Sequence, residues 1–378
     1  MARLGDVCTI VSGSTPKSNI PEYWDGDIKW ITPAELNEET YIINDSIRHI
    51  TELGVAKTGL KPFPKGTVIL SSRAPIGKTA IAGCEMYCNQ GFKNLICSDK
   101  INSRYLYWFL TCNTEYLNSL GRGATFKEIS KEIVANIEIP LPSVEQQIFI
   151  AEKFEKLSEL IVLRKKQLVK LDQLVKSRFI ELFGATSAEK CTTKIKDYAD
   201  VLGGYAFKSD LFCTNAVPVI RISNINNGGV ELDYDICFDE LFWEQNKRFR
   251  AEQNDILIAM SGATTGKAGV YKKNMPALIN QRVACIRAKD GIACPEFLFV
   301  ATQLEWMYDL IQETSAGCAQ PNISGKQIEN MPVPNATYEQ QQQFAAFVEQ
   351  TDKSKLAIQQ SLDKLETLKK SLMQEHFG

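Results

Sequence analysis

Two turns in the chain carry residue types that bind phosphate in other proteins. Residues 72–79 read Ser-Arg-Ala-Pro-Ile-Gly-Lys-Thr, and residues 262–267 read Gly-Ala-Thr-Thr-Gly-Lys. A nucleotide-binding P-loop needs a first glycine, full spacing and a Ser or Thr after the lysine, so that amides wrap the phosphates and the hydroxyl meets Mg²⁺. The first turn has Ser72 instead of the glycine, and the second is one residue short and continues with Ala268. Both turns therefore argue against nucleotide hydrolysis and predict a strand followed by a glycine-bearing loop that approaches nucleic acid closely.

Amide side chains form a second pair of turns, at Asn89-Gln90 and at Asn280-Gln281-Arg282. Asn and Gln pair bidentately with adenine, and Arg pairs with guanine. Asn also satisfies turn backbone with its own side chain, so the sequence leaves both interpretations open. A third pair of turns, 121–127 and 316–322, precedes an Ile-Ser dipeptide in each case, and its polar tips are further candidate contacts.

The candidate DNA contacts come from these turns and from one strand end, at 221–224, that leads toward them. They are Ser72, Arg73, Lys78, Asn89, Gln90, Lys93, Arg122, Thr125, Lys127, Arg221, Asn224, Ser261, Thr264, Lys267, Gln281, Arg282, Gln320 and Asn322.

An internal repeat places these turns at equivalent positions of two halves. Lys-Leu-x-x-Leu-x-Lys-Ser recurs at 170–177 as Lys-Leu-Asp-Gln-Leu-Val-Lys-Ser and at 364–371 with Lys369 at its sixth position, and each copy runs on to Phe-Gly. The same offset pairs Glu145-Gln146-Gln147 with Glu339-Gln340-Gln341, while further upstream the offset drifts. There we align Gly77-Lys78 with Gly266-Lys267, Gly13 with Gly204, and Trp30-Ile31-Thr32 with Arg221-Ile222-Ser223. A repeat this long is too large for a solenoid unit and indicates two similar domains.

Each half ends in a long helix that begins at a capping box. Ser143 with Gln146, and Thr337 with Gln340, follow prolines that stop the preceding segment. Steps of three and four then predict a heptad seam at Phe154, Leu157, Ile161, Arg164, Leu168, Leu171, Val175, Arg178 and Leu182, and a weaker seam at Ile358, Leu362, Leu365 and Leu372. We expect the two helices to pack on each other, antiparallel, as a coiled-coil spacer between globular domains. The alternative is that each helix lies on its own domain.

These elements predict a mixed α/β (α+β) fold with two globular domains and two long antiparallel helices. The expected segments are a first recognition domain at 1–142, a central helix at 143–184, a second recognition domain at 185–336 and a C-terminal helix at 337–378. Strand-like runs such as 67–70 and 256–259 alternate with dense turn signals. Apolar runs at 105–110 and 297–300 read as the starts of buried helices.

Composition excludes several classes of function. The chain of 378 residues carries a formal net charge of −2, which is not the charge of a protein that coats nucleic acid. Asp and Glu outnumber Lys and Arg in 191–336. Eleven scattered cysteines without a Cys-x-x-Cys pair, and 2 histidines, favour reduced cysteines in a cytoplasmic protein and predict neither a metal site nor a histidine-based catalytic site. We expect no membrane span and no secretory signal.

The ordered set of features, present twice, resembles the specificity subunits of type I restriction-modification systems. It comprises the strand and turn from Gly66 to Lys78, the Asn89-Gln90 turn, Pro140-Leu141-Pro142 with Glu145-Gln146-Gln147, and their counterparts in the second half. The resemblance implies that each domain reads one half of a bipartite double-stranded DNA target. It implies that the helices set the gap and bind two methyltransferase subunits, which hold S-adenosylmethionine and modify adenine at N6. Restriction subunits would join for cleavage, and this chain would be non-catalytic with no cofactor of its own.

Two other classes of function stay open at this stage. One is a fused or fragmentary DNA methyltransferase or nuclease, but the chain contains no Asp-Pro-Pro-Tyr or Asn-Pro-Pro-Tyr/Phe motif, no Phe-x-Gly-x-Gly turn for a methyl donor and no nuclease-type Glu-x-Lys pair. The other is a coiled-coil scaffold that binds only protein, against which the polar glycine loops at equivalent positions count.

The near-neutral charge leads to a first prediction. Since little of the affinity can come from bulk attraction to phosphates, the isolated chain should bind DNA weakly and with little specificity, and a complex with methyltransferase subunits should bind tightly. Gel shifts with specific and scrambled duplexes check this. Specific nanomolar binding by the isolated chain would contradict it.

Overall fold

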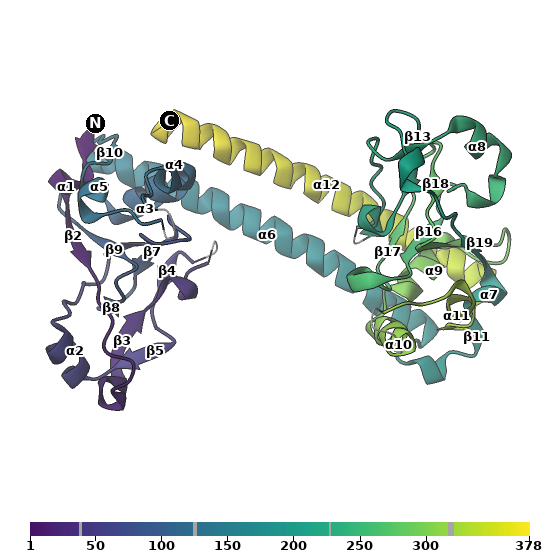
Figure 1. Cartoon of the computed structure of the whole chain (residues 1–378), viewed down its shortest axis with the longest axis horizontal. Coiled ribbons are helices and arrows are strands. Elements are labelled where there is room, and N and C mark those ends of the chain that lie inside the picture. Colours follow the sequence, from purple (N-terminus) through teal and green to yellow (C-terminus); the bar gives the residue numbers. More distant parts are fainter. Residues whose placement is uncertain (38–39, 124–126, 227, 317–320) are drawn as a thin grey trace. The chain divides into compact units, whose positions relative to one another are not determined.

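The computed structural model describes residues 1–37, 40–123, 127–226, 228–316 and 321–378. The chain forms two compact units, and each is described by itself. Unit 1 contains 1–164 and 361–378, and unit 2 contains 165–360. The long helices α6 (Val144–Phe183) and α12 (Tyr338–Phe377) are each 40 residues and contribute to both units (Figure 1). The four-segment division expected from the sequence stays a prediction.

Unit 1 is built from short strands and helices around a five-stranded sheet. Its elements are β1 (Ala2–Arg3), α1 (Leu4–Val7), β2 (Cys8–Ser12), β3 (Trp24–Ile31), β4 (Ile42–Ile43), β5 (Arg48–Ile50), α2 (Glu52–Thr58), β6 (Val68–Leu70), β7 (Thr79–Ala82), β8 (Tyr87–Cys88), β9 (Lys93–Cys97), α3 (Ser103–Cys112), α4 (Thr114–Ser119), α5 (Lys131–Ala135) and β10 (Glu138–Ile139).

Unit 2 repeats this series. Its elements are β11 (Thr193–Lys194), α7 (Ile195–Tyr198), β12 (Ala199–Gly203), β13 (Val217–Ile220), β14 (Gly228–Gly229), β15 (Cys237–Phe238), α8 (Glu240–Gln245), β16 (Ile256–Ala259), β17 (Ala268–Val270), β18 (Leu278–Ile279), β19 (Val283–Ala288), α9 (Pro295–Thr302), α10 (Glu305–Ser315), α11 (Gly325–Glu329) and β20 (Pro332–Val333).

The sheets of the two units have the same topology, strand for strand. Unit 1 has sheets ordered β2-β9-β6-β7-β4, β5-β3-β8 and β1-β10, and unit 2 has β12-β19-β16-β17-β14, β15-β13-β18 and β11-β20. The parallel pairs also correspond, since β3 with β8 and β4 with β7 match β13 with β18 and β14 with β17. The predicted fold class, a mixed α/β repeat with two long helices, is confirmed.

One detail of the predicted alignment is wrong. Ile31 pairs with Cys88 in unit 1, and Ile220 pairs with Ile279 in unit 2, so Ile31 corresponds to Ile220 and Thr32 to Arg221. The sequence alignment had placed Arg221 opposite Trp30, two residues away. Thr32 and Arg221 each precede a short 3₁₀ helix, whose third residue accepts a hydrogen bond from their backbone amide.

The start of each long helix is capped as predicted and then anchored by a buried glutamine. Ser143 with Gln146, and Thr337 with Gln340, form capping boxes. Gln147 is fully buried; its Oε1 accepts from the Asn102 amide at 2.8 Å, and its Nε2 donates to the carbonyls of Lys100 and Pro142.

In unit 2, Gln341 makes the matching bonds to the Cys294 amide and to the carbonyls of Ile292 and Ala336. The repeated Glu-Gln-Gln therefore joins each long helix to the start of the buried helix, α3 or α9, that the sequence predicted.

Within each unit the long helices pack on each other and also lie against the globular part, so both arrangements expected from the sequence are partly right. In unit 1, Phe154 of α6 stacks on Phe377 of α12 at 5.5 Å, and both belong to the core of that unit. In unit 2, Phe179 of α6 meets Phe344 of α12 at 5.2 Å within the second core, and Lys355 pairs with Asp172. Within unit 2 these contacts run antiparallel. Each unit thus contains the start of one helix packed on the end of the other, and both lie against the domain.

The predicted packing positions are buried or half-buried. Phe154, Leu157, Ile161, Val175 and Leu362 are buried, whereas Leu168, Leu171, Ile358, Leu365 and Leu372 are half-buried. The prediction that Leu182 belongs to the packing seam is wrong. Its side chain is 38% exposed, and Phe179 and Phe183 face the core instead.

The end of α12 gives a second prediction. Phe377→Ala should destabilise unit 1 by about 3 kcal/mol, because the ring stacks on Phe154 and also contacts Tyr105 and Phe109. Hydrogen–deuterium exchange should therefore rise in α3 but not in α9. Leu368→Ala, which shortens an exposed side chain of the same helix, is the control and should leave both unchanged. Equal increases in α3 and α9 would contradict the assignment of Phe377 to unit 1.

Candidate nucleic-acid interface

The predicted turns of unit 1 converge at one edge of its sheets. We call residues 13–15, 32–36, 72–78, 89–93, 122–123 and 127–128 loop cluster 1. Backbone hydrogen bonds join them: the Ser14 amide donates to Cys88, the Ser72 amide to Gly91, and the Ile129 amide to Ser72. Turns that are distant in sequence therefore form one surface, as the repeated pattern predicted.

Unit 2 has the same frame, with residues 204–207, 221–224, 260–267, 280–282 and 321–322 as loop cluster 2. The Tyr205 amide donates to Ile279, the Met260 amide to Arg282, and the Ile323 amide to Met260, which are the bonds of unit 1 at equivalent positions. The hydrogen-bonded frame is repeated, and the side chains that it carries differ.

A close backbone approach explains one repeated glycine in each cluster. A Cβ on Gly13 would lie 2.1 Å from the Cys88 carbonyl oxygen, and a Cβ on Gly204 would lie 2.2 Å from that of Asn280. No side chain fits at such a distance. Glycine therefore lets the loop that leaves the first long strand of each unit lie directly against the Asn-Gln turn.

Four predicted contacts of loop cluster 1 are accessible. Arg73, Gln90, Arg122 and Lys127 are exposed, and Gln90 is steadied by a hydrogen bond from the Thr15 hydroxyl. Thr125 lies outside the described residues.

Three other predicted contacts of unit 1 have side chains that face the protein, and their role in DNA binding stays a prediction. Ser72 is fully buried, and the buried Lys93 ammonium donates to its hydroxyl and to Glu128. The Lys78 ammonium donates to the carbonyls of Pro33 and Leu36, at 3.2 and 2.6 Å. In this conformation these residues hold the loops together.

The two Asn side chains follow the turn alternative that the sequence left open. Asn89 Oδ1 accepts from the Gly91 amide at 2.9 Å, and Asn280 Oδ1 accepts from the Arg282 amide at 3.2 Å. Each Asn therefore shapes its turn. The exposed neighbours, Gln90 in unit 1 and Gln281 with Arg282 in unit 2, keep their side chains available.

Glu128 is a functional candidate that the sequence reasoning missed. Its carboxylate pairs with Arg73 at 2.9 Å and with Lys93 at 3.2 Å. Partial burial pushes the pKa of Glu128 upward, but hydrogen bonds from Arg73 and Lys93 outweigh it and leave the pKa below its usual value. A half-exposed, charged carboxylate can accept from the N4 amino group of cytosine. Glu128 directly follows the predicted turn 121–127, so a search of that turn for acidic as well as basic side chains would have identified it.

Unit 2 has no counterpart of this ion-pair group at the equivalent positions. Strand pairing and bridges place Ser261 opposite Asn322 where unit 1 has Arg73 opposite Glu128, and Ala284 stands at the position of Lys93. At these three positions the two clusters therefore present different chemistry on one frame, with charged groups in unit 1 and uncharged groups in unit 2.

Loop cluster 2 exposes three of its predicted contacts, namely Gln281, Arg282 and Asn322. Asn224 is buried and accepts from the Arg221 amide, and its predicted DNA contact stays a prediction. Arg221 is half-buried and pairs with Asp233 at 3.1 Å. Gln320 lies outside the described residues.

Unsatisfied polar atoms also gather in loop cluster 2. Ser261 Oγ, Thr264 Oγ1 and Arg221 Nε are buried and have no hydrogen-bond partner among the described residues. Lys267 is half-buried beside Thr264 and shows no ion pair within the described ranges. Buried polar atoms without partners cost free energy, so a ligand that supplied those hydrogen bonds would gain from them.

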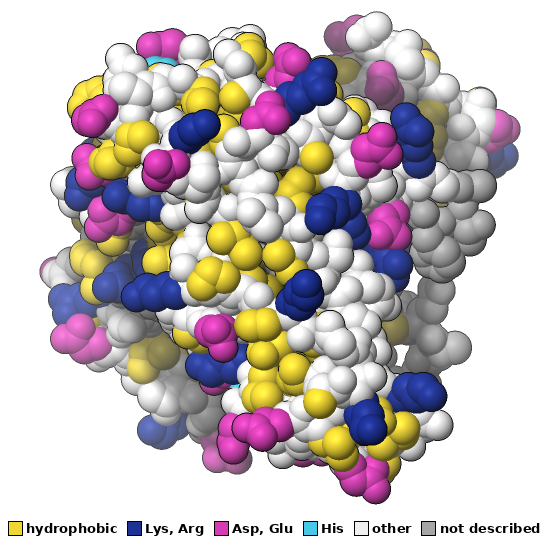
Figure 2. Space-filling view, turned by 90° about the vertical axis from the view of Figure 1, so that its left-hand side faces the viewer, with side chains coloured by type: hydrophobic (Ala, Val, Ile, Leu, Met, Phe, Trp, Pro, Cys, Tyr) yellow, Lys and Arg dark blue, Asp and Glu magenta, His cyan; other side chains and the backbone are white. Residues whose placement is uncertain are grey.

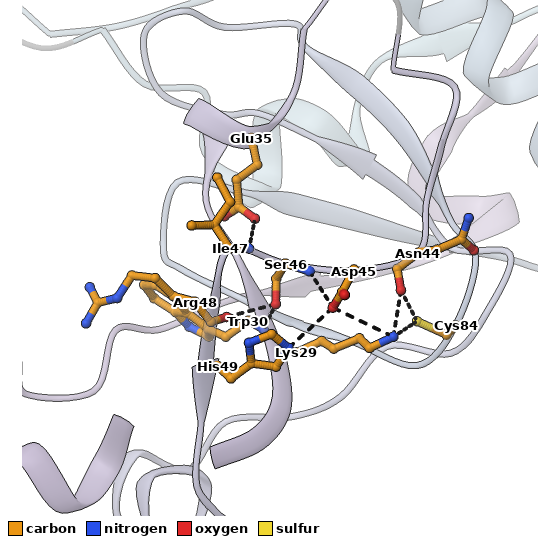
Figure 3. Close-up of polar contacts among 10 residues, drawn as sticks. All are labelled: Lys29, Trp30, Glu35, Asn44, Asp45, Ser46, Ile47, Arg48, His49 and Cys84. Atoms are coloured by element: carbon orange, nitrogen blue, oxygen red, sulfur yellow. Dashed lines mark hydrogen bonds and ion pairs between the residues drawn. The ribbon is translucent and has the colours of Figure 1, made fainter. Parts of the chain in front are cut away.

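The hydrogen-bonded segment between β4 and β5 of unit 1 leads to one more cation that the sequence analysis overlooked (Figure 3). Glu35 accepts from the Ile47 amide, and the Ser46 hydroxyl bridges the Trp30 amide and the Arg48 carbonyl. Asp45 is paired with Lys29 and His49. The exposed Arg48 guanidinium lies 3.6 Å from the ring centroid of Trp24, a cation–π contact that fixes the side chain.

Charge on the surface of unit 1 is mixed. In the view of Figure 2, Lys and Arg side chains are interspersed with Asp and Glu and with apolar side chains. No group of three or more His, Cys, Asp or Glu residues is placed to hold a metal ion within the described parts of the chain. The site chemistry that remains is hydrogen bonding and local charge.

A comparison with known protein families identifies the family to which this chain belongs. The family model described as "Type I restriction modification DNA specificity domain" matches residues 1–173 and again 189–369. The chain belongs to the type I restriction-modification specificity subunits. The match covers both units, as the strand-for-strand repeat requires.

Curated relatives in this family are specificity subunits of type I restriction enzymes. The MjaIX specificity subunit of Methanocaldococcus jannaschii is 34% identical over 291 residues, which cover 71% of this chain and 67% of the relative. The MjaVIII subunit of the same organism is 25% identical across 99% of this chain and 90% of its own length. The EcoKI subunit of Escherichia coli K12 is 24% identical across 85% and 76%.

Solved structures show the same fold. A chain from a study of "complex assembly and conformational transition of the type I R-M system" aligns with a TM-score of 0.65 at 17% identity, over 100% of this chain and 96% of that one. The S subunit from M. genitalium aligns with a TM-score of 0.59 at 14% identity, over 100% and 95%. Among the described residues, no helix of this specificity subunit is long and apolar enough to cross a membrane.

The ion-pair group at Glu128 yields a third prediction. Glu128→Gln should lower the melting temperature at neutral pH, because the buried Lys93 loses a charged partner. The folded pKa of Glu128 lies below its ordinary value of 4.5, so the stabilisation is complete above that value and is lost as the pH falls through the folded pKa. The difference in melting temperature should therefore stay constant from pH 7 to about 5 and shrink in more acidic buffer.

Glu132→Gln, which alters a nearby exposed carboxylate on α5, is the matched control and should have little effect at any pH. A difference between wild type and Glu128→Gln that did not change with pH would show that the charge of Glu128 contributes nothing to stability.

Proposed function

We propose that this specificity subunit reads a bipartite double-stranded DNA target, with loop cluster 1 on one half-site and loop cluster 2 on the other. The observation that carries the proposal is the repeated hydrogen-bonded frame with different exposed side chains. Arg73, Gln90 and Glu128 in unit 1, against Gln281 and Arg282 in unit 2, offer different patterns of donors and acceptors to base edges.

The long helices would fix the gap between the half-sites and bind the modification subunits. At 1.5 Å per residue, a helix of 40 residues is about 60 Å long. Repeated positions on the helices expose large apolar side chains, which supports docking of two copies of one partner. Val162 and Leu368 in unit 1 are 40% and 49% exposed, and their counterparts in unit 2, Leu356 and Leu174, are 61% and 48% exposed.

The chemistry would reside in those partners. Two methyltransferase subunits would bind S-adenosylmethionine and transfer the methyl group to adenine N6, and restriction subunits would join for cleavage in the cytoplasm. This chain would supply sequence discrimination without catalysis. A fused enzyme or a protein-only scaffold is less well supported, since the exposed polar loops are repeated and no catalytic motif accompanies them.

Methylome sequencing tests the proposal. Deleting the chain should abolish one bipartite adenine methylation motif. If methylation continued unchanged, the chain would be a scaffold rather than a reader, and loss of methylation at many unrelated motifs would point to an enzyme.

The modular arrangement gives a fourth prediction. Replacing Arg73 or Gln90 should change recognition of one half-site only, and replacing Gln281 or Arg282 should change only the other. Each direct contact should contribute roughly 1–3 kcal/mol of discrimination. Sequencing of methylated sites in cells that carry each variant measures this.

Lys65→Ala, an exposed cation outside loop cluster 1, is the control and should leave both half-sites as they are. The modular proposal fails if a variant in one unit alters both half-sites equally. Inserted helical turns in α6 and α12 should lengthen the gap and keep both half-sites.

A further inference from the structure

Unit 2 contains an open pocket of about 860 Å³ between its helix pair and its globular part. Val175 of α6, Val348 of α12 and Phe299 with Val300 of α9 form much of its apolar wall. Glu296, Glu349, Asp172 and Asp352 add carboxylates, and Lys176, Lys272 and Lys355 add ammonium groups. Every lining residue belongs to unit 2.

The equivalent place in unit 1 is filled by aromatic side chains. Gln147 and Gln341 make equivalent hydrogen bonds to the starts of α3 and α9, and these bonds align the two helices residue by residue. In this alignment Tyr107 corresponds to Phe299, and Trp108 to Val300. Trp108 stacks on Phe154 at 5.5 Å, and Tyr41 contacts Tyr107 at 4.7 Å and Trp108 at 6.0 Å.

Unit 2 lacks most of this aromatic filling. Val300 and Val348 stand where unit 1 has Trp108 and Phe154, which leaves part of the space open. Gly229 corresponds to Ile42 by its pairing in the sheet. Gly228, which lines the pocket, therefore stands at the position of Tyr41 and has no side chain to fill the space.

The charges in the two places also differ. In unit 1, Glu155 accepts from the Arg104 guanidinium at 2.6 Å and from the Tyr41 hydroxyl. Partial burial pushes the pKa of Glu155 upward, but the bonds from Arg104 and Tyr41 outweigh it and hold the pKa below its usual value. At the equivalent positions, unit 2 has Glu349 for Glu155 and Glu296 for Arg104. Two carboxylates therefore line the pocket where unit 1 has an ion pair.

Two of the three lysines of the pocket compensate other groups, and the third, Lys176, is exposed and has no ion pair among the described residues. Lys272 pairs with Asp352 at 2.9 Å, and Lys355 pairs with Asp172 at 2.6 Å. The contact of Glu349 is with Lys353, one turn away on α12, where both side chains are well exposed and attraction is weak. Glu296 has no ion pair among the described residues. An apolar wall with two such carboxylates suits a ligand with an apolar body and a cationic end.

We propose that this pocket receives a segment of the methyltransferase subunit that carries an arginine beside an aromatic side chain. The guanidinium would pair with Glu349 and Glu296, as Arg104 pairs with Glu155 in unit 1, and the ring would occupy the space that Trp108 fills there. Arginine fits better than lysine, because its planar fork binds carboxylates bidentately and stacks on aromatic rings.

The methyltransferase subunit is the favoured occupant because the pocket adjoins its proposed docking surface. Val175 and Lys355 line the pocket, and the exposed Leu174 and Leu356 are their immediate neighbours on α6 and α12. The inference rests on the proposed function, and it makes the docking surfaces of the two units unequal. Unit 1 supplies its own arginine and aromatic rings, and unit 2 takes them from the partner.

Glu296→Arg in the full chain tests the inference. The variant gives unit 2 the residue of unit 1, so that its own guanidinium pairs with Glu349 and blocks the pocket. We expect the affinity of one of the two methyltransferase subunits to fall at least about tenfold. Native mass spectrometry should then show complexes with one methyltransferase at concentrations where wild type forms complexes with two.

Glu305→Arg, the same charge change at an exposed position of α10, is the matched control and should assemble like wild type. Glu349→Gln removes the carboxylate without filling the pocket and should weaken the same binding event. Circular dichroism and melting curves establish that each variant is folded.

A photoreactive amino acid in place of Gln303, at the wall of the pocket, identifies the occupant. Crosslinks should map to one methyltransferase segment with an arginine beside an aromatic residue. The inference is overturned if Glu296→Arg binds two methyltransferase subunits with wild-type affinity, or if crosslinks map to a segment without arginine. If wild type binds no methyltransferase subunit at all, the proposed function fails as well.

Discussion

Aromatic packing at the ends of the two long helices is the contact on which the rest of each unit depends. Phe154 and Phe377 complete the core of unit 1, and Phe179 and Phe344 complete that of unit 2. In unit 1 this stack continues through Trp108 into α3, which packs on β6 and β7. The loop from 72 to 78 joins those two strands. Helix packing therefore supports the two strands that carry part of loop cluster 1.

The repeat separates what must be the same in both units from what must differ. The buried glutamines, the capping boxes and the close approaches at Gly13 and Gly204 are the same, because they hold the helix and the loops in place. The exposed side chains differ, as the proposed reading of two different half-sites requires. Glu128 and Asn322 occupy matching positions of the frame and illustrate this divergence.

Periodicity and turn chemistry are local signals, and the features that they determine could be predicted. The two helices, their caps, the repeat and the positions of the loops all follow from them. Whether a polar side chain on a loop faces in or out depends on distant partners. Lys93 is buried because Glu128, 35 positions away, compensates its charge, and Lys78 turns inward toward carbonyls at 33 and 36. The pocket of unit 2 could not be predicted from the sequence for the same reason. It reflects the loss of aromatic packing, and the residues of that packing come from three separate segments.

Unit 1 combines residues 1–164 with residues 361–378, so its parts are synthesised at different times. Every residue of unit 2 has been made once the ribosome passes residue 360, whereas the core of unit 1 waits for Phe377. Until then, Phe154, Tyr105 and Phe109 lack their contacts with Phe377, and the first domain to be synthesised is the last to be completed. A chain that stopped before Phe377 would leave that core incomplete, and the quality-control proteases of a cell degrade proteins with such defects.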